Sequence, residues 1–335
     1  MKYSQLTQKQ KQLVINQVAE ATNYHPDIIE KDWWVTQVLR AVFSLPYAEH
    51  LSFKGGTSLS KCWHLIERFS EDVDIAVSRD FLGYGGNLTR TQISDKLRRA
   101  ACSFVREKMQ FDLHEVLVNQ GIEENAFAVK VNITPVSTTD PETIVVEYQS
   151  ALSGSPYIRH CVLIEVSGRS MQQPVKCEEI QSFIDQYLPN SIVAEKPFAI
   201  PNVVTPERTF LEKVFLLHEE FGKPQQEIRT TRMSRHLYDI VSMMKAGVAD
   251  RALSDTSLYH SIVEHRRQFV NLKGFDYDTL YPAGLSIIPS ETVEDAWRKD
   301  YEQMRMSMIY GEAPSFEVVL ANLRRLQERI KLLPD

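Results

Sequence analysis

The sequence predicts an α+β fold, in which a lobe that mixes strands and helices is followed by a helical lobe. Between residues 127 and 166, short apolar segments separated by Pro and Gly are typical of strands. Beyond Thr205, apolar residues recur at helical spacing. Thr205 is a good helix N-cap and Pro206 a good first helical residue. We therefore expect an α/β lobe at residues 1–204 and a helical lobe at residues 205–335.

Hydrophobic spacing and turn residues give the expected elements in order. In the first lobe we predict helices at 7–21, 26–43, 59–67 and 89–108, and strands at 51–53, 72–77, 111–118, 127–133, 143–148 and 161–166. In the second lobe we predict helices at 206–219, 233–246, 256–272, 290–309 and 315–332.

The composition argues against several classes of protein. The 335 residues carry a formal net charge of −6, which argues against a surface that is basic throughout, so any contact with RNA must be local. The four cysteines are scattered, without a C-x-x-C pair, which argues against structural zinc and a disulfide framework. We expect a cytoplasmic protein with no membrane span, since no apolar run approaches the length of one.

Two glycines lie between the strand expected at 51–53 and the helix expected at 59–67. Gly55 and Gly56 allow the backbone to approach a ligand closely, and free N–H groups at the start of a helix can bind an anion. The alternative is a plain strand–turn–helix corner, and the spacing is not that of a P-loop. The candidate phosphate-binding residues are Lys54, Gly55, Gly56, Thr57, Ser58 and Lys61.

Two aspartates alternate with apolar residues in the next predicted strand. Asp72 and Asp74 should point to one face, with Val73 and Ile75 on the other. Neighbouring carboxylates repel each other unless a cation lies between them, and oxygen ligands favour Mg²⁺ or Mn²⁺. The alternative is a solvated strand face. The glycine pair followed by the aspartate pair predicts nucleotidyl transfer from a nucleoside triphosphate (NTP).

These motifs resemble those of the DNA polymerase beta-like nucleotidyltransferase superfamily. The fuller pattern in segments 54–61 and 68–74, with the lead-in at 29–36, resembles the AbiEii/AbiGii-type toxin nucleotidyltransferases. The resemblance implies a nucleotidyltransferase-like first lobe with a mixed sheet, and a second lobe that completes the active site. It also implies metal-dependent transfer from an NTP to RNA, at the 3′ acceptor end of tRNA, and a cognate antitoxin in a toxin–antitoxin system that defends against phage by abortive infection.

The superfamily resemblance implies a third carboxylate on a later strand. Glu165, in an apolar segment, is the first candidate for this metal ligand, and Glu147 is its rival. The alternative for either is an acid on an exposed strand face.

Two further catalytic residues are expected in the second lobe. Lys213 lies on the apolar side of its predicted helix, where it could reach a triphosphate or extend to water. Asp239 matches the last motif that the resemblance implies. It could orient Lys213, or simply form an intrahelical ion pair with Arg235. His64, His218 and His236 lack metal-ligand spacing, and we expect them to be packing or surface residues on helices.

Alternatives to an RNA-modifying enzyme stay open at this point. The same chemistry could adenylylate a protein or a small molecule, and the chain could also be a catalytically silent nucleotide-binding module. Basic segments that could bind RNA phosphates, or be ordinary solvated faces, contain Arg90, Lys96, Arg98, Arg99, Arg106 and Lys108 in one helix and Lys223, Arg229, Arg232 and Arg235 near another.

Overall fold

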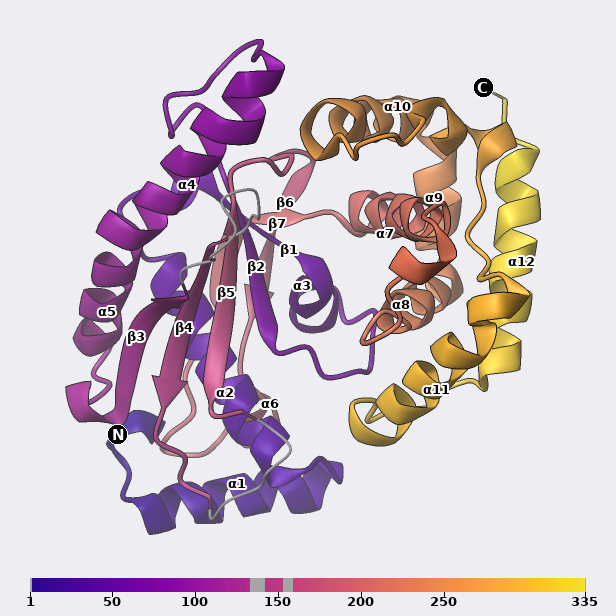
Figure 1. Ribbon diagram of the computed structural model, residues 1–335. Coiled ribbons are helices and arrows are strands. Elements are labelled where there is room, and N and C mark those ends of the chain that lie inside the picture. The colour runs from indigo at the N-terminus through magenta and orange to yellow at the C-terminus, as the bar shows by residue number, and fades with distance from the viewer. Residues whose placement is uncertain (1, 133–141, 153–158, 335) are drawn as a thin grey trace. The chain divides into compact units, whose positions relative to one another are not determined.

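Figure 1 shows the computed structural model, which describes residues 2–132, 142–152 and 159–334. Ile133, the last residue of a predicted strand, lies outside these ranges. The chain divides into two compact units. The first contains Met1–Cys62 and Ser70–Val204, and the second contains Trp63–Phe69 and Thr205–Asp335.

The first unit is built on a seven-stranded sheet with the strand order β3-β4-β5-β2-β1-β7-β6. The pairs β2–β5 and β1–β7 are parallel and the others are antiparallel. This mixed sheet and the surrounding helices confirm the predicted α+β fold. The strands are β1 (Leu51–Lys54), β2 (Asp72–Val77), β3 (Phe127–Asn132), β4 (Glu142–Tyr148), β5 (Cys161–Ser167), β6 (Val175–Ile180) and β7 (Phe198–Val204).

Helices of the first unit are α1 (Gln8–Thr22), α2 (Pro26–Val42), α3 (Gly55–Lys61), α4 (Arg98–Phe104), α5 (Gln110–Asn119) and α6 (Phe183–Tyr187). Pro26 occupies the first turn of α2, where its missing N–H costs no hydrogen bond. Two π-helical stretches, Gln92–Leu97 and Val105–Met109, flank α4, so that a helical run continues into α5 (Figure 1).

The strand predicted at 111–118 is wrong, because this segment is helix α5. Met109, Leu113 and Leu117 are fully buried at intervals of four residues, whereas Phe111 is 64% exposed. The apolar residues therefore follow a helical period rather than a two-residue alternation.

The helix predicted at 59–67 is also wrong in its bounds. Helix α3 begins four residues earlier, at Gly55, and ends at Lys61. His64, which we expected on a helix, instead has a φ of +50°, a left-handed conformation that a right-handed helix does not contain. Strands β6 and β7 were not predicted.

Helix α2 carries charged residues into the interior of the first unit, and three of them, Glu30, Lys31 and Asp32, have partners there. The Lys31 ammonium lies 2.8 Å from Glu71, and the Lys61 ammonium lies 2.5 Å from Asp32. Glu30 accepts a hydrogen bond from the backbone N–H of Ala151. Because a buried charge without a partner is very costly, these contacts fix α2 against the segments before β2 and at the end of α3.

The second unit consists of helices joined by loops, and it includes the segment Trp63–Phe69, which we call the connector because it joins α3 to β2 in sequence. Within this unit the connector pairs with the chain after α11 through an antiparallel bridge between Arg68 and Ile309. No helix in the described parts of the chain is long and apolar enough to cross a membrane. The helices are α7 (Pro206–Phe221), α8 (Arg235–Lys245), α9 (Val248–Ser254), α10 (Thr256–His265), α11 (Glu291–Ser307) and α12 (Phe316–Lys331).

Candidate functional site

The two predicted aspartates share one face of β2. Asp72 and Asp74 are half-buried, whereas Val73 and Ile75 between and after them are fully buried. Successive side chains on a strand point to opposite faces, so the apolar residues pack into the core while both carboxylates emerge on the other side.

Glu165 lies directly beside Asp74 in the sheet. Strands β2 and β5 are parallel, and their register pairs Asp74 with Glu165. Paired positions on adjacent strands project to the same face, so Glu165 joins the face of the two aspartates. Glu147 is one strand farther away, on β4, and its carboxylate forms an ion pair with Lys130.

The glycine corner approaches the same carboxylate. Gly55 has a φ of +81°, and a Cβ atom added there would lie 1.9 Å from Oδ2 of Asp74. Lys54, the residue before it, is the register partner of Asp74 on β1. Only glycine therefore fits at position 55, because both the left-handed backbone and the nearby carboxylate exclude a side chain.

The hydroxyls and the second lysine of this corner have internal partners. Thr57 Oγ1 donates a hydrogen bond to the carbonyl oxygen of Asp72, 2.5 Å away, and Ser58 Oγ donates to the carbonyl oxygen of Gly55, 2.9 Å away. Lys61 pairs with Asp32. Thr57 thus holds α3 against β2 and Lys61 holds it against α2, whereas the Ser58 hydrogen bond lies within α3. Their predicted contact with phosphate stays a prediction.

Replacing Gly55 with alanine is expected to destabilise the protein by at least about 2 kcal/mol, from left-handed strain and displacement of the Asp74 carboxylate. Gly83→Ala is the matched control, because Gly83 has the same φ of +81° and nothing within 4 Å of an added Cβ. Urea unfolding of both variants should give the larger loss for Gly55→Ala. Equal losses would show that Asp74 does not restrict position 55.

In the second unit, the predicted residues Lys213 and Asp239 meet. The ammonium of Lys213, on α7, lies 2.9 Å from Oδ2 of Asp239 on α8. Arg68 of the connector approaches the same carboxylate with two nitrogens, Nε at 2.7 Å and Nη2 at 2.8 Å. Asp239 therefore contacts both Arg68 and Lys213, in keeping with the expectation that it could orient Lys213.

The charges in this cluster depend on one another. Burial alone would raise the pKa of Asp239, but the charges of Arg68 and Lys213 outweigh it and hold that pKa well below its ordinary value. Burial lowers the pKa of Lys213, although Asp239 opposes the shift. Asp239 is therefore a carboxylate that orients two cations, and since it is fully buried it does not face solvent.

His236, which we expected to be a packing or surface residue, lies in the same cluster. Its Nδ1 lies 3.3 Å from the ammonium of Lys213. Desolvation, together with the positive charges of Lys213 and Arg235, lowers the pKa of His236 well below its ordinary value of 6.5. The imidazole is therefore neutral at neutral pH.

The lowered pKa of His236 predicts acid sensitivity of folding. Above pH 6.5 the ring is neutral in both states, so it contributes no pH dependence. Below pH 6.5 the unfolded ring binds a proton and the folded ring does not, so the free energy of unfolding should fall by up to about 1.4 kcal/mol per pH unit. In urea unfolding between pH 6.5 and 5, the decline should be shallower for His236→Asn than for the wild type, and parallel declines would contradict this.

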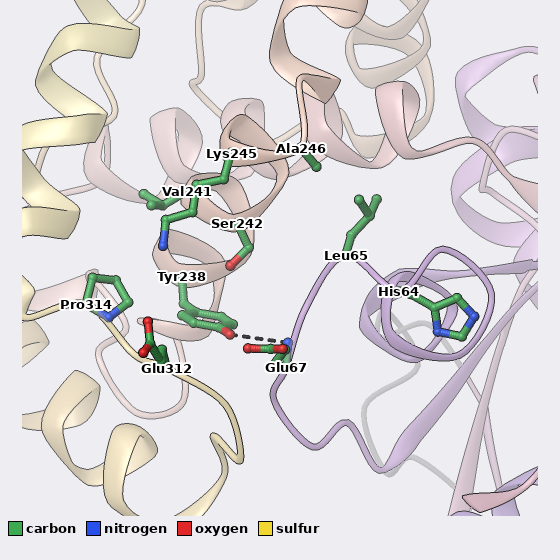
Figure 2. Close-up of a pocket in the computed structure, with 10 residues that line it drawn as sticks. All are labelled: His64, Leu65, Glu67, Tyr238, Val241, Ser242, Lys245, Ala246, Glu312 and Pro314. Atoms are coloured by element: carbon green, nitrogen blue, oxygen red, sulfur yellow. Dashed lines mark hydrogen bonds between the residues drawn. The ribbon is translucent and has the colours of Figure 1, made fainter. Parts of the chain in front are cut away.

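The connector has a second anchor on α8, shown in Figure 2. The backbone N–H of Glu67 donates a hydrogen bond to the hydroxyl of Tyr238, 3.2 Å away. The two residues line a pocket of about 310 Å³ together with His64, Leu65, Val241, Ser242, Lys245, Ala246, Glu312 and Pro314. Neighbouring residues of the connector, Glu67 and Arg68, thus contact neighbouring residues of α8.

The donor set on the sheet face fits a hard divalent cation. Asp72, Asp74 and Glu165 offer only carboxylate oxygens, which suit Mg²⁺ or Mn²⁺, and they emerge on one face of two adjacent strands. Within residues 2–132, 142–152 and 159–334, no three His, Cys, Asp or Glu side chains are gathered as closely as a metal site requires. The backbone thus aligns the three acids, but their carboxylate groups do not converge on one metal-binding point.

The basic segments contain many paired charges. In the helical run that includes α4 and α5, Arg99 pairs with Asp95, Lys108 with Asp112, and Arg106 with Glu142. Near the end of α7, Lys223 and Arg229 both pair with Glu220. These residues do not form a uniformly positive surface.

Sequence reasoning did not predict the contacts of Arg68, His236 and Lys31. Arg68 lies in the motif segment 68–74 and Lys31 in the lead-in segment 29–36, but the sequence does not indicate the distant partner of either residue. His236 lies three residues before Asp239, one helical turn away, so its proximity to that motif was the available signal.

Two solved structures are similar to this chain at low sequence identity. No curated protein matches the chain. The crystal structure of JHP933 from Helicobacter pylori is 13% identical, with a TM-score of 0.35, 84% of this chain covered and 96% of that chain. A candidate nucleotidyltransferase from H. pylori is 12% identical, with a TM-score of 0.42, 92% of this chain covered and 96% of that chain. Such low scores carry no argument about function.

A match to a protein-family model identifies the family of this chain. The model of the nucleotidyl transferase AbiEii toxin of type IV toxin–antitoxin systems matches residues 37–322, which include every predicted site residue. This family implies an NTP substrate and an antitoxin partner. The chain belongs to the AbiEii family of nucleotidyl transferase toxins.

Proposed function

We propose that this nucleotidyltransferase is metal-dependent and transfers nucleotides from an NTP to RNA, at the 3′ acceptor end of tRNA. The observation that carries the proposal is the sheet register, which aligns Asp74 with Glu165 and leaves Asp72 on the same face. Three aligned carboxylates beside a glycine corner suit metal-assisted transfer of a nucleotide. A sheet face with a purely structural role would not require three carboxylates.

Asp72, Asp74 and Glu165 would hold Mg²⁺ or Mn²⁺. Glu165 is preferred to Glu147 because it adjoins Asp74, while Glu147 lies one strand away and pairs with Lys130. Bound there, the cation would supply positive charge for the triphosphate, the leaving pyrophosphate and the acceptor hydroxyl. The strand register fixes the backbone positions of the three acids, so only their side chains would have to turn toward the bound cation.

The phosphates would be bound by the glycine corner and by Lys213. Gly55 lies against Asp74, so a phosphate near the metal ligands would also be near the backbone of Gly55 and Gly56. Ser58 and Thr57 support this backbone through their internal hydrogen bonds. Lys213, oriented by Asp239, would add a positive charge from the helical unit, and Lys54 would add one from β1.

Nucleotides added to the 3′ end of tRNA would block aminoacylation and therefore translation. In a cytoplasmic toxin this would stop growth, which suits abortive infection as a defence against phage. The cognate antitoxin would relieve the block.

The test is incubation of the pure protein with Mg²⁺, total tRNA and each labelled NTP in turn. We expect label on tRNA from at least one NTP, and none when the metal is removed with a chelator. Label that persists with chelator would contradict the metal dependence. The paired basic segments give a reason to include protein and small-molecule acceptors in parallel, and label on these but not on tRNA would overturn the RNA acceptor.

A further inference from the structure

The ammonium of Lys213 has two partners inside its own unit. Asp239 Oδ2 lies 2.9 Å away and His236 Nδ1 lies 3.3 Å away. A lysine ammonium has three N–H donors, and these are arranged tetrahedrally. With two donors directed at Asp239 and His236, the direction of the third is fixed.

His236 can accept this hydrogen bond only in one form. The ring must be neutral, with its proton on Nε2, because a protonated Nδ1 is a donor. The groups around the ring are the ammonium of Lys213, the guanidinium groups of Arg235 and Arg68, and the carboxylate of Asp239. Desolvation by burial, followed by the charges of the surrounding cations, lowers the pKa of His236, so the neutral acceptor form is the stable one.

We propose that His236 is a positioning residue, which accepts one N–H of Lys213 so that the remaining N–H is directed at a phosphate oxygen of the nucleotide. This inference rests on the proposed function of Lys213. A lysine side chain is long and flexible, so a single contact with Asp239 would leave the ammonium free to rotate about that contact. A second contact removes this freedom, and misplacement of a catalytic group by about 1 Å can cost about 100-fold in rate.

Three substitutions separate positioning from packing. Asparagine places its Oδ1 acceptor the same number of bonds from the backbone as Nδ1 of histidine, whereas glutamine places its amide one bond farther out. Leucine fills similar space without an acceptor. We expect His236→Asn to retain kcat within about threefold, and His236→Leu and His236→Gln to lose about 10- to 100-fold. All three should keep the thermal midpoint close enough to wild type for assay at 25 °C.

A role in packing alone predicts a different order. Asparagine leaves more empty space than leucine or glutamine, so it would then be the most damaging of the three substitutions. A wild-type kcat for His236→Gln, or an Asn variant no better than the Gln variant, would overturn the proposal. Glutamine is polar and similar in size to histidine, so the Gln comparison holds even if the Leu variant fails to fold.

A second readout does not depend on activity. Nitrogen NMR of histidine-labelled protein, with the His236 signals assigned by their loss in His236→Asn, reports which ring nitrogen is protonated. We expect an unprotonated Nδ1 whose shift changes in Lys213→Met. A proton on Nδ1 would overturn the inference even if nucleotide transfer is observed. An absence of transfer by the wild type, with Nδ1 unprotonated and sensitive to Lys213, would count against the proposed function instead.

Discussion

Substitution of Asp72 or Asp74 by asparagine should lower the rate of nucleotide transfer at least about 1,000-fold, which corresponds to about 4 kcal/mol of lost transition-state stabilisation. Asparagine keeps the size of the side chain and removes its charge, so the half-buried positions on β2 should still pack normally. The loss would arise because a neutral amide binds a hard divalent cation much less strongly than a carboxylate does.

The matched control is Glu147→Gln, which removes one negative charge from β4, one strand beyond Glu165. We expect its transfer rate to stay within about threefold of wild type, since the exposed pair with Lys130 contributes little. Glu165→Gln should behave like the aspartate variants. If Glu147→Gln were inactive and Glu165→Gln active, the assignment of the third carboxylate would be reversed. Near-wild-type rates for both aspartate variants would contradict the proposed chemistry.

The sequence could predict those parts of the fold and site that depend on local patterns. Alternation along residues 72–77 gave both the strand and the common face of Asp72 and Asp74, because side-chain direction on a strand follows from position alone. The same reasoning failed at residues 111–118, where β-branched and aromatic residues suggested a strand but the buried positions follow a helical period.

Contacts between distant segments could not be predicted in this way. The register that pairs Asp74 with Glu165 depends on which strands become neighbours, and the hydrophobic pattern of β5 does not specify that. Arg68 and Asp239 are 171 residues apart in sequence. They share one compact unit because the connector, which contains Arg68, belongs to the helical unit. The resemblance to a family identified Asp239, but neither it nor the local sequence identified the partner that holds it.

Loss of that partner should strongly destabilise the helical unit. Arg68 is 2% exposed and Asp239 is fully buried, so Arg68→Met would leave a buried carboxylate without the guanidinium that contacts both of its oxygens. Removing one member of a buried ion pair typically costs about 3–5 kcal/mol, because the remaining charge is desolvated without compensation. Equilibrium urea unfolding, followed by tryptophan fluorescence to which the buried Trp297 on α11 contributes, would measure this loss.

The second unit offers a matched control for the loss of an arginine. Arg251 also forms an ion pair with an acidic residue, Glu207, but its side chain is 56% exposed, and Arg251→Met should cost less than about 1 kcal/mol. Addition of Asp239→Asn to Arg68→Met should recover part of the stability, since it removes the unbalanced charge. A loss for Arg68→Met as small as that for Arg251→Met would show that the Arg68–Asp239 pair does not hold the connector. If Arg68→Met causes a large loss of stability that Asp239→Asn does not relieve, the loss comes from the packing of the arginine side chain rather than from its charge.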